Sequence, residues 1–275
     1  MLNLFFRKNF YDGWDNVMFF FVPNLIIDAL IILCTGIASL GVTVFKDYSF
    51  FLYIWILLGL ILITGASIAT LAWAECSKDI ADYGTIEFKD FFKALKTCVK
   101  DGILYALSMV VVIIAGAAGY LVFLKPKGNE ISFAGLLAGV CYIWTAIIVI
   151  GALFWFPSVR AYMHNPFGKT LKKSFIVLFD NIFVSIILGF YNLFLTVISV
   201  IMLGLAPGMC GIQLARANAF RLLMKKYDYL DELDKKGEPL NSKARRIPWK
   251  TLLQEEYEAN PVRGFRAFVF PWKES

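Results

Sequence analysis

The chain has 275 residues, of which 59% are hydrophobic and 17% charged, and its formal net charge is +6. Ordinary soluble domains carry about 25% charged residues, and a soluble core cannot absorb so much apolar surface, whereas runs of about 20 apolar residues match a bilayer. The basic residues flank the apolar runs, as topology determinants and contacts to anionic lipids do, so nucleic-acid binding is not expected. The composition predicts an all-α, polytopic membrane helix bundle.

The first ten residues, MLNLFFRKNF, do not form a secretory signal. The apolar stretch after them is too long for a signal core, so we expect an uncleaved first span. The cysteines are odd in number and scattered, which predicts neither a disulfide framework nor a metal site. We interpret them as small apolar packing residues and expect no cofactor. They are Cys34, Cys76, Cys98, Cys141 and Cys210.

The apolar runs predict a six-span membrane domain over residues 1–227 and a cytoplasmic tail over 228–275. The sixth run is the least apolar, because it contains Gln213, Arg216, Asn218 and Arg221. The positive-inside rule makes the basic loops cytoplasmic, together with the amino terminus, and a sixth crossing brings the basic tail to the same side. We therefore expect an inner-membrane-type protein with both termini in the cytoplasm. The predicted spans lie near 17–44, 50–74, 103–124, 133–156, 175–205 and 207–224.

Aromatic and basic residues mark the expected inner surface. Trp14, Trp73 and Trp155 fall at the inner ends of three spans, where indole rings favour the membrane interface. Two amphipathic segments, before the third and fifth spans, predict interfacial helices. These segments either anchor the protein to lipid or dock a partner protein. Their candidate contact residues are Phe88, Phe91, Phe92, Lys93 and Lys96, and then Lys169, Lys172 and Lys173.

Two charged residues fall inside predicted spans. Asp28 lies near the middle of the first span and Arg216 near the middle of the sixth. A charge at the bilayer centre costs at least about 2.5–3.5 kcal/mol on insertion scales, so such residues face the bundle and find partners. The matching depths predict a buried Asp28–Arg216 pair, which either fixes the helix register or forms a substrate or ion site. Asn192, Gln213 and Asn218 are further polar candidates for this cluster.

No catalytic constellation is apparent, and we do not expect an enzyme. His164 is the only histidine and lacks the partners of a triad or a metal site. No phosphate-binding glycine loop occurs. The last segment is too aromatic to remain in water, so it either folds back under the bundle or binds another protein, through Phe268, Phe270 and Trp272.

Three segments carry a resemblance to a known family. They are TIEFKDFFKALKTCVKDGILYAL, FWFPSVRAYMHNPFGKTLKKSFIVLFDN and PGMCGIQLARANAFRLLMKKY. The chain resembles the YesL-like family of bacterial membrane proteins from about Asn16 to Tyr227. That family is linked with carbohydrate uptake operons that contain ABC importers, so the resemblance implies a transport-associated role and an ABC permease as a partner. It transfers no catalytic residue.

Two functions from different classes remain open. The first is a non-enzymatic accessory, assembly or regulatory partner of a bacterial carbohydrate uptake system. The alternative is a small secondary transporter or channel with a polar site around Asp28 and Arg216. A water-accessible polar cavity that reaches Asp28 would favour transport, whereas a filled bundle would favour the accessory role.

Overall fold

The computed structural model describes residues 1–44, 48–124, 133–236 and 247–264. Within these ranges the chain forms helices and short connections, and no β-strand. The helices are α1 (Leu2–Asp15), α2 (Val17–Val44), α3 (Tyr48–Ala81), α4 (Phe88–Gly119) with its π-helical extension η1 (Tyr120–Leu124), α5 (Phe133–Met163), α6 (Phe167–Asp180), α7 (Ile182–Ile201), α8 (Gly208–Lys235), α9 (Trp249–Leu252) and α10 (Gln254–Ala259).

Five of the described helices are long and apolar enough to cross a membrane, and they belong to α2, α3, α4, α5 and α7. Large apolar side chains are exposed along all five, as expected for helices that contact lipid. The prediction of an all-helical, multi-pass membrane protein is confirmed. α8 lacks the apolar composition of the other five, so the sixth span stays a prediction.

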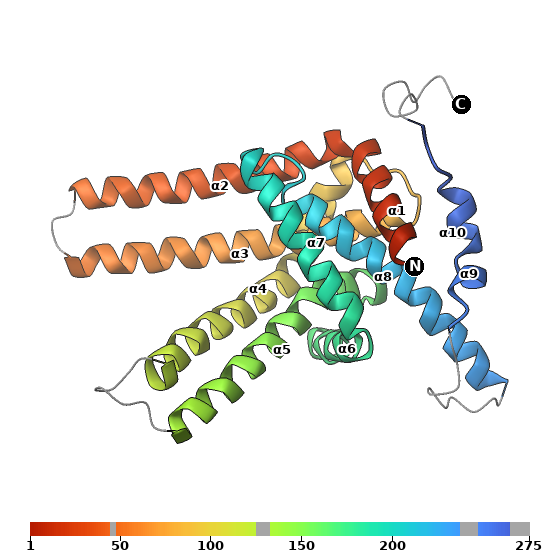
Figure 1. Cartoon of the computed structure of the whole chain (residues 1–275). Helices are drawn as coiled ribbons and strands as arrows, with labels where there is room; N and C mark the ends of the chain where they lie inside the picture. Colours follow the sequence, from red (N-terminus) through yellow and green to blue (C-terminus); the bar gives the residue numbers. More distant parts are fainter. Residues whose placement is uncertain (45–47, 125–132, 237–246, 265–275) are drawn as a thin grey trace.

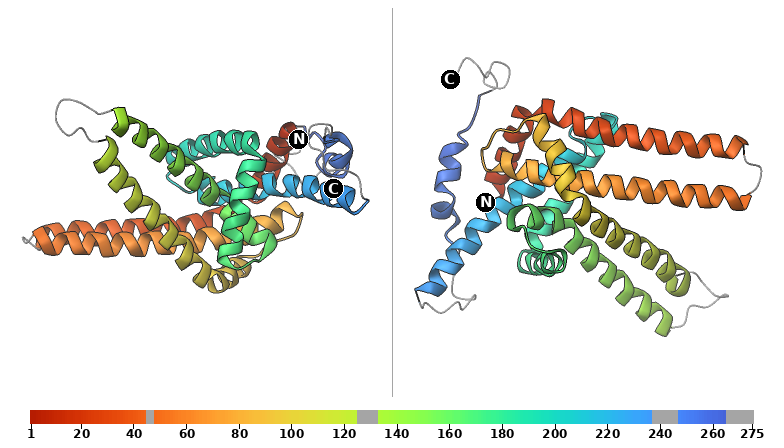
Figure 2. Two further views of the ribbon diagram at one scale, coloured as in Figure 1. Left: turned by 90° about the horizontal axis from the view of Figure 1, so that it is seen from below. Right: turned by 180° about the vertical axis from the view of Figure 1, so that it is seen from behind.

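The long helices form two hairpins that diverge from a common base. α2 and α3 lie side by side in every view, and so do α4 and α5 (Figures 1 and 2). α1, α6 and α8 gather at the base, where the hairpins meet (Figures 1 and 2), and α7 packs against α8.

The predicted amphipathic helix and third span form one continuous helix, α4. Gly102, at the expected break, lies against α3: a Cβ added there would be 2.5 Å from Ile68 Cγ1. A glycine at such a contact lets two helix backbones approach closely. Gly102 thus marks the crossing of α3 and α4 rather than a break.

The apolar run 175–205, expected to be one span, is divided in two. α6 ends at Asp180, Asn181 leaves the helical conformation with φ −132°, and α7 begins at Ile182. The Asn181 amide donates to the Val177 carbonyl (3.1 Å) and to the Tyr227 hydroxyl (2.6 Å). Asn181 thereby gives a carbonyl in the last turn of α6 a hydrogen-bond donor, and it links the junction between α6 and α7 to α8.

α8 is the central helix of the base. It packs against α1, α2, α3, α5 and α7, and Leu214, Ala215 and Phe220 on it are almost completely buried. Since protein rather than lipid surrounds this helix, its polar side chains can find protein partners. The low hydropathy of α8 therefore follows from its position in the bundle.

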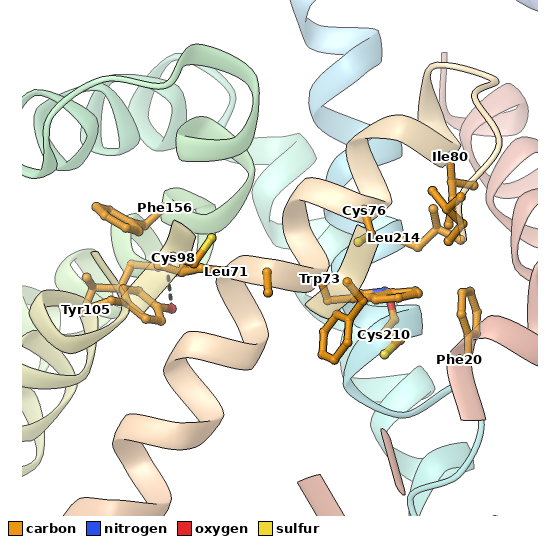
Figure 3. Close-up of a cluster of buried hydrophobic side chains, with 14 residues drawn as sticks. Phe20, Leu71, Trp73, Cys76, Ile80, Cys98, Tyr105, Phe156, Cys210 and Leu214 are labelled. Atoms are coloured by element: carbon orange, nitrogen blue, oxygen red, sulfur yellow. Dashed lines mark hydrogen bonds between the residues drawn. The ribbon is translucent and has the colours of Figure 1, made fainter. Parts of the chain in front are cut away.

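Two of the three tryptophans expected at the interface are core residues instead. Trp73 is 3% exposed and Trp155 is completely buried. The Trp73 indole donates to the Cys210 carbonyl of α8 (3.0 Å) and meets Phe20 edge-on (Figure 3). The Trp155 indole donates to Ser185 Oγ (2.8 Å). Both indoles join helices, which overrides the preference of tryptophan for the interface.

The connection between α7 and α8 lies beside the first half of α2. The Asn24 amide donates to the carbonyls of Leu205 (2.9 Å) and Pro207 (3.2 Å), and its Oδ1 accepts the Cys210 N–H (3.2 Å). Asn24 and Asp28 stand about 10 and 16 Å from the start of α2 by helical rise, and α2 continues for about 24 Å beyond Asp28. The α7–α8 turn therefore ends well short of the far end of the hairpins.

A group of ion pairs joins the helices at the base. Arg160 of α5 pairs with Glu75 of α3 and with Asp101 of α4, the latter at 2.9 Å. These side chains are 12%, 19% and 25% exposed. One partly buried guanidinium thus holds three long helices together.

The amino-terminal helix α1 packs into the base rather than only marking topology. Lys8 is completely buried, with Nζ 3.0 Å from Asp12 Oδ2 and 3.6 Å from the centroid of the Tyr83 ring. Burial lowers the pKa of Lys8 and raises the pKa of Asp12, while their mutual attraction opposes both shifts. The pair satisfies two charges that the fold removes from water.

The carboxyl-terminal segment docks on the same end. Leu253 is completely buried, and the Glu256 carboxylate, 2% exposed, accepts from Arg221 of α8 and from the Tyr83 hydroxyl. This segment forms the two short helices α9 and α10. Arg263 then pairs with Asp15 at the end of α1 (2.8 Å).

Candidate functional site at the start of helix α8

Asp28 and Arg216 do not pair, so the predicted ion pair is wrong. Asp28 lies against the α7–α8 turn: a Cβ added to Gly204 would be 2.6 Å from Asp28 Oδ1. Arg216 lies about 12 Å farther along α8 than Gly208, by helical rise, and stacks on Phe154 of α5. The prediction failed because it assumed that α8 crosses the whole bilayer, whereas α8 begins at the level of Asn24.

Arg216 lines a cavity of about 350 Å³ between α3, α4 and α8. That volume is within the range of small-molecule sites. The polar lining consists of one guanidinium, one amide and three hydroxyl side chains on an otherwise apolar wall. The lining residues are Ile63, Ala66, Ser67, Thr70, Tyr105, Met109, Ile113, Met209, Ile212, Gln213 and Arg216.

The Arg216 guanidinium has no counter-charge in the described part of the chain. Its Nε is buried without a hydrogen-bond partner, and no described carboxylate forms an ion pair with it. The guanidinium lies over the Phe154 ring, whose centroid is 4.0 Å from Cζ. A cation–π contact stabilises a cation by up to about 2 kcal/mol. Burial of a cation without an anion costs several kcal/mol. The cavity therefore favours a ligand with negative charge.

The neighbouring amide is also incompletely satisfied. Gln213 is 2% exposed, and its Oε1 has no hydrogen-bond partner. Gln213 and Arg216 are three residues apart and so share one face of α8. Together they offer a bidentate cation and an amide, which suits a carboxylate or phosphate that carries a further polar group.

Hydroxyl groups complete the polar part of the cavity. Ser67 and Thr70, three residues apart on α3, are 5% and 6% exposed. The Tyr105 hydroxyl of α4 donates to the Leu153 carbonyl (3.1 Å), which fixes its ring (Figure 3). Sequence reasoning missed these three residues; the i, i+3 spacing of two hydroxyls in an apolar run was the available signal.

Asp28 lines a second cavity of about 230 Å³ on the other side of the first turns of α8. Met209 and Ile212 line both cavities, so the two share a wall. The cavity lies between α2, α7 and the α7–α8 turn. Its lining residues are Asn24, Ile27, Asp28, Ile31, Thr196, Ser199, Val200, Gly204, Gly208, Met209 and Ile212.

The other two predicted members of the polar cluster lie elsewhere. Asn218 is buried at the base, where its amide donates to Asn9 Oδ1 (3.2 Å), and the Asn9 amide donates to the Tyr191 hydroxyl (2.9 Å). Asn192 on α7 is 5% exposed, and neither polar atom of its side chain has a hydrogen-bond partner. The five predicted residues therefore do not form one cluster: Asp28 lines one cavity, Gln213 and Arg216 line another, Asn218 bonds to Asn9, and Asn192 has no hydrogen-bond partner.

The predicted surface residues separate in the same way. Phe91 is 2% exposed and packs on Trp73 in the core, whereas Phe88 and Phe92 are 42% and 46% exposed. The candidate lysines of both amphipathic segments are exposed, except Lys173, which is half-buried. They are Lys93, Lys96, Lys169, Lys172 and Lys173; Phe268, Phe270 and Trp272 lie outside the described residues.

No family model, curated protein or solved structure matches the chain. The resemblance to the YesL-like family therefore stays a prediction. Among the described residues, no group of three or more histidine, cysteine, aspartate or glutamate side chains could hold a metal ion.

Proposed function

We propose that this chain is a non-enzymatic, multi-pass membrane protein of the transport class that binds a small anionic solute in the Arg216 cavity. This proposal reverses the order of the two functions that the sequence left open. A water-accessible polar cavity that reaches Asp28 was the feature expected of a transporter, and Asp28 does line a cavity of about 230 Å³, although its wall is mostly apolar. The second, larger cavity contains the cation.

The observation that carries the proposal is the unpaired guanidinium of Arg216. A structural arginine inside a membrane protein normally finds a carboxylate or backbone carbonyls. Arg216 instead has a buried Nε without a partner and lines a cavity together with Gln213, whose Oε1 is also without a partner. A carboxylate or phosphate group would satisfy the cation.

The contact between the two chain ends supports an even number of membrane crossings. Arg263, after α8, pairs with Asp15, before α2, so both segments lie on one side of the membrane. α2 to α5 supply four crossings and return the chain to the side of Asp15. α7 and α8 must then enter the membrane from this side and come back to it. Two further full crossings, six in all, would do this, and so would a re-entrant α7–α8 hairpin after four crossings. The position of the turn beside Asn24 favours the hairpin. By the positive-inside rule, we assign this side to the cytoplasm of a bacterial inner membrane.

Thermal unfolding of the purified full-length protein in lipid nanodiscs tests the proposal. Matched pairs of an anion and a neutral analogue, such as benzoate with benzamide and succinate with succinamide, are compared, with inorganic phosphate as a further probe. A ligand that binds only the folded protein raises the Tm with concentration. We expect at least one anion to raise the Tm while its neutral partner does not. Equal shifts within every pair, with none from phosphate, would contradict an anion site.

The accessory role in a carbohydrate uptake system is the second candidate. The observation that favours it is the pair of exposed Phe88 and Phe92 side chains, which lie beside exposed Lys93 at the base of α4. Such a surface suits lipid head groups or a membrane partner. Recovery of an ABC permease after cross-linking in native membranes would favour this candidate, and recovery of the chain alone would count against it.

A further inference from the structure

The α7–α8 turn places non-helical backbone beside the first half of the apolar helix α2. Residues 202–207 break the helical pattern between α7 and α8, and Leu203, Gly204 and Gly208 have positive φ values of 53°, 82° and 57°. Irregular backbone at membrane depth is tolerated only where protein buries it or where it lines a water-filled cavity. The Asp28 cavity lies directly against this turn and supplies such a space.

The Asp28 carboxyl group has no positive partner in this cavity. Its Oδ2 is buried without a hydrogen-bond partner, and no described lysine or arginine pairs with it. The cavity lining contains no other titratable group. The segment of α3 that faces α2, residues 54–72, contains none either. Within the described part of the chain, nothing therefore balances a negative charge on Asp28.

The polar neighbours of Asp28 also use their hydrogens elsewhere. The Thr196 hydroxyl donates to the Asn192 carbonyl (2.8 Å), and the Ser199 hydroxyl donates to the Leu195 carbonyl (2.7 Å). The Asn24 amide donates to carbonyls of the turn. These side chains therefore offer no donor to an ionised Asp28 carboxylate, and an uncompensated charge at this depth is costly. The neutral acid fits this site, and the ionised form does not.

We propose that Asp28 is a proton-binding site at the α7–α8 turn, and that its proton is the coupling ion for the anion bound at Arg216. The proton is taken from water and released to water, so no other reactant is needed. The coupling rests on the proposed anion site, whereas the proton site stands on the Asp28 cavity alone. Discontinuous helices hold substrate and coupling-ion sites in several transporter folds.

The wall shared by the two cavities can transmit a change at Asp28 to the Arg216 cavity, and the charge of Asp28 determines whether anion affinity rises or falls. Met209 and Ile212 of α8 line both cavities, so a change in the packing of the turn against Asp28 reaches the Arg216 cavity through the first turns of α8. An ionised Asp28 disfavours an anion nearby, and a protonated Asp28 does not. The affinity for the anion should therefore increase as the pH falls, and by linkage the anion should favour protonation of Asp28.

The proton site is tested with an apolar carbodiimide, which reacts with protonated carboxyl groups inside membranes. The full-length protein in nanodiscs is labelled over a range of pH, and the modified residues are identified by peptide mass mapping. We expect label on Asp28 that decreases as the pH rises, and none on exposed Asp231 in the same sample. Equal labelling of the two, or no label on Asp28 at any pH, would overturn the proton site.

The coupling is tested by anion binding to Asp28→Asn, with Asp231→Asn as the matched control. The asparagine side chain resembles the protonated acid, so Asp28→Asn should bind the anion as tightly as the wild type does at acidic pH. We expect the anion affinity of the wild type to change at least threefold with pH and that of Asp28→Asn to stay constant. Asp28→Ser serves if Asp28→Asn does not fold. An unchanged pH dependence in the folded variant overturns the coupling and leaves the anion site standing. If no anion binds even the wild type, the anion site and the coupling both fail, and the carbodiimide result still decides the proton site.

Discussion

Arg160→Ala is expected to lower the free energy of unfolding by about 3–5 kcal/mol, the usual cost of breaking a buried ion pair. The reason is the geometry at the base, where Arg160 contacts Glu75 and Asp101 from two other helices. Without the guanidinium, two carboxylates, 19% and 25% exposed, lose the cation that they share. Thermal and denaturant unfolding in mild detergent measures the effect.

A triple neutral variant is the control for this prediction. Replacing Arg160 by Met, Glu75 by Gln and Asp101 by Asn removes all three charges and keeps similar side-chain volumes. Neutral replacements of whole ion-pair groups are often tolerated, so the triple variant should be more stable than Arg160→Ala. If the single variant is as stable as the wild type, Arg160 does not hold α3, α4 and α5 together.

Arg216→Gln should weaken anion binding by about 30-fold or more, because truncation of one partner of a buried charge pair costs about 2–5 kcal/mol. Arg216→Lys should give an intermediate loss, because it keeps the charge and loses the bidentate geometry. The dissociation constant of any anion that raises the Tm is measured by titration in nanodiscs. An anion affinity that decreases from the wild type to Arg216→Lys and then to Arg216→Gln would indicate recognition by the guanidinium and not a general effect on packing.

The matched control for this series is Lys169→Gln. Lys169 is exposed on α6, so this substitution removes the same unit of charge far from either cavity. Its anion affinity should equal that of the wild type. If Lys169→Gln and Arg216→Gln weaken binding equally, the effect comes from the net charge of the protein.

The apolar helices could be predicted from the sequence, but their positions relative to one another could not. Composition and run length determine that a helix is buried in lipid, and both hairpins follow from them. The level at which a chain turns inside the membrane depends on tertiary contacts, such as those of Asn24 with Leu205 and Pro207. The predicted pairing of Asp28 with Arg216 failed at this step, because helical rise was counted from an incorrect starting depth.

The residues of the candidate site show the same division. Asp28, Gln213 and Arg216 were recognisable as candidates, since a polar residue in an apolar run stands out in a sequence, and all three line cavities. Ser67 and Thr70 do not stand out, because hydroxyl side chains can bond to their own helix and are common in membrane segments. Trp73 and Trp155 were misplaced, because their indoles bond across helices rather than at the interface.

The charge preference of the Arg216 cavity gives the most direct test of an anion site. Ala66 lines this cavity and is half-buried, so Ala66→Cys, in a background with the exposed Cys141 replaced by Ser, reports on access. Two thiol-reactive methanethiosulfonates of similar size, one negative and one positive, are compared. We predict faster reaction with the negative reagent and loss of this preference in Arg216→Gln. Reaction with neither reagent, or a preference that persists without Arg216, would contradict the account.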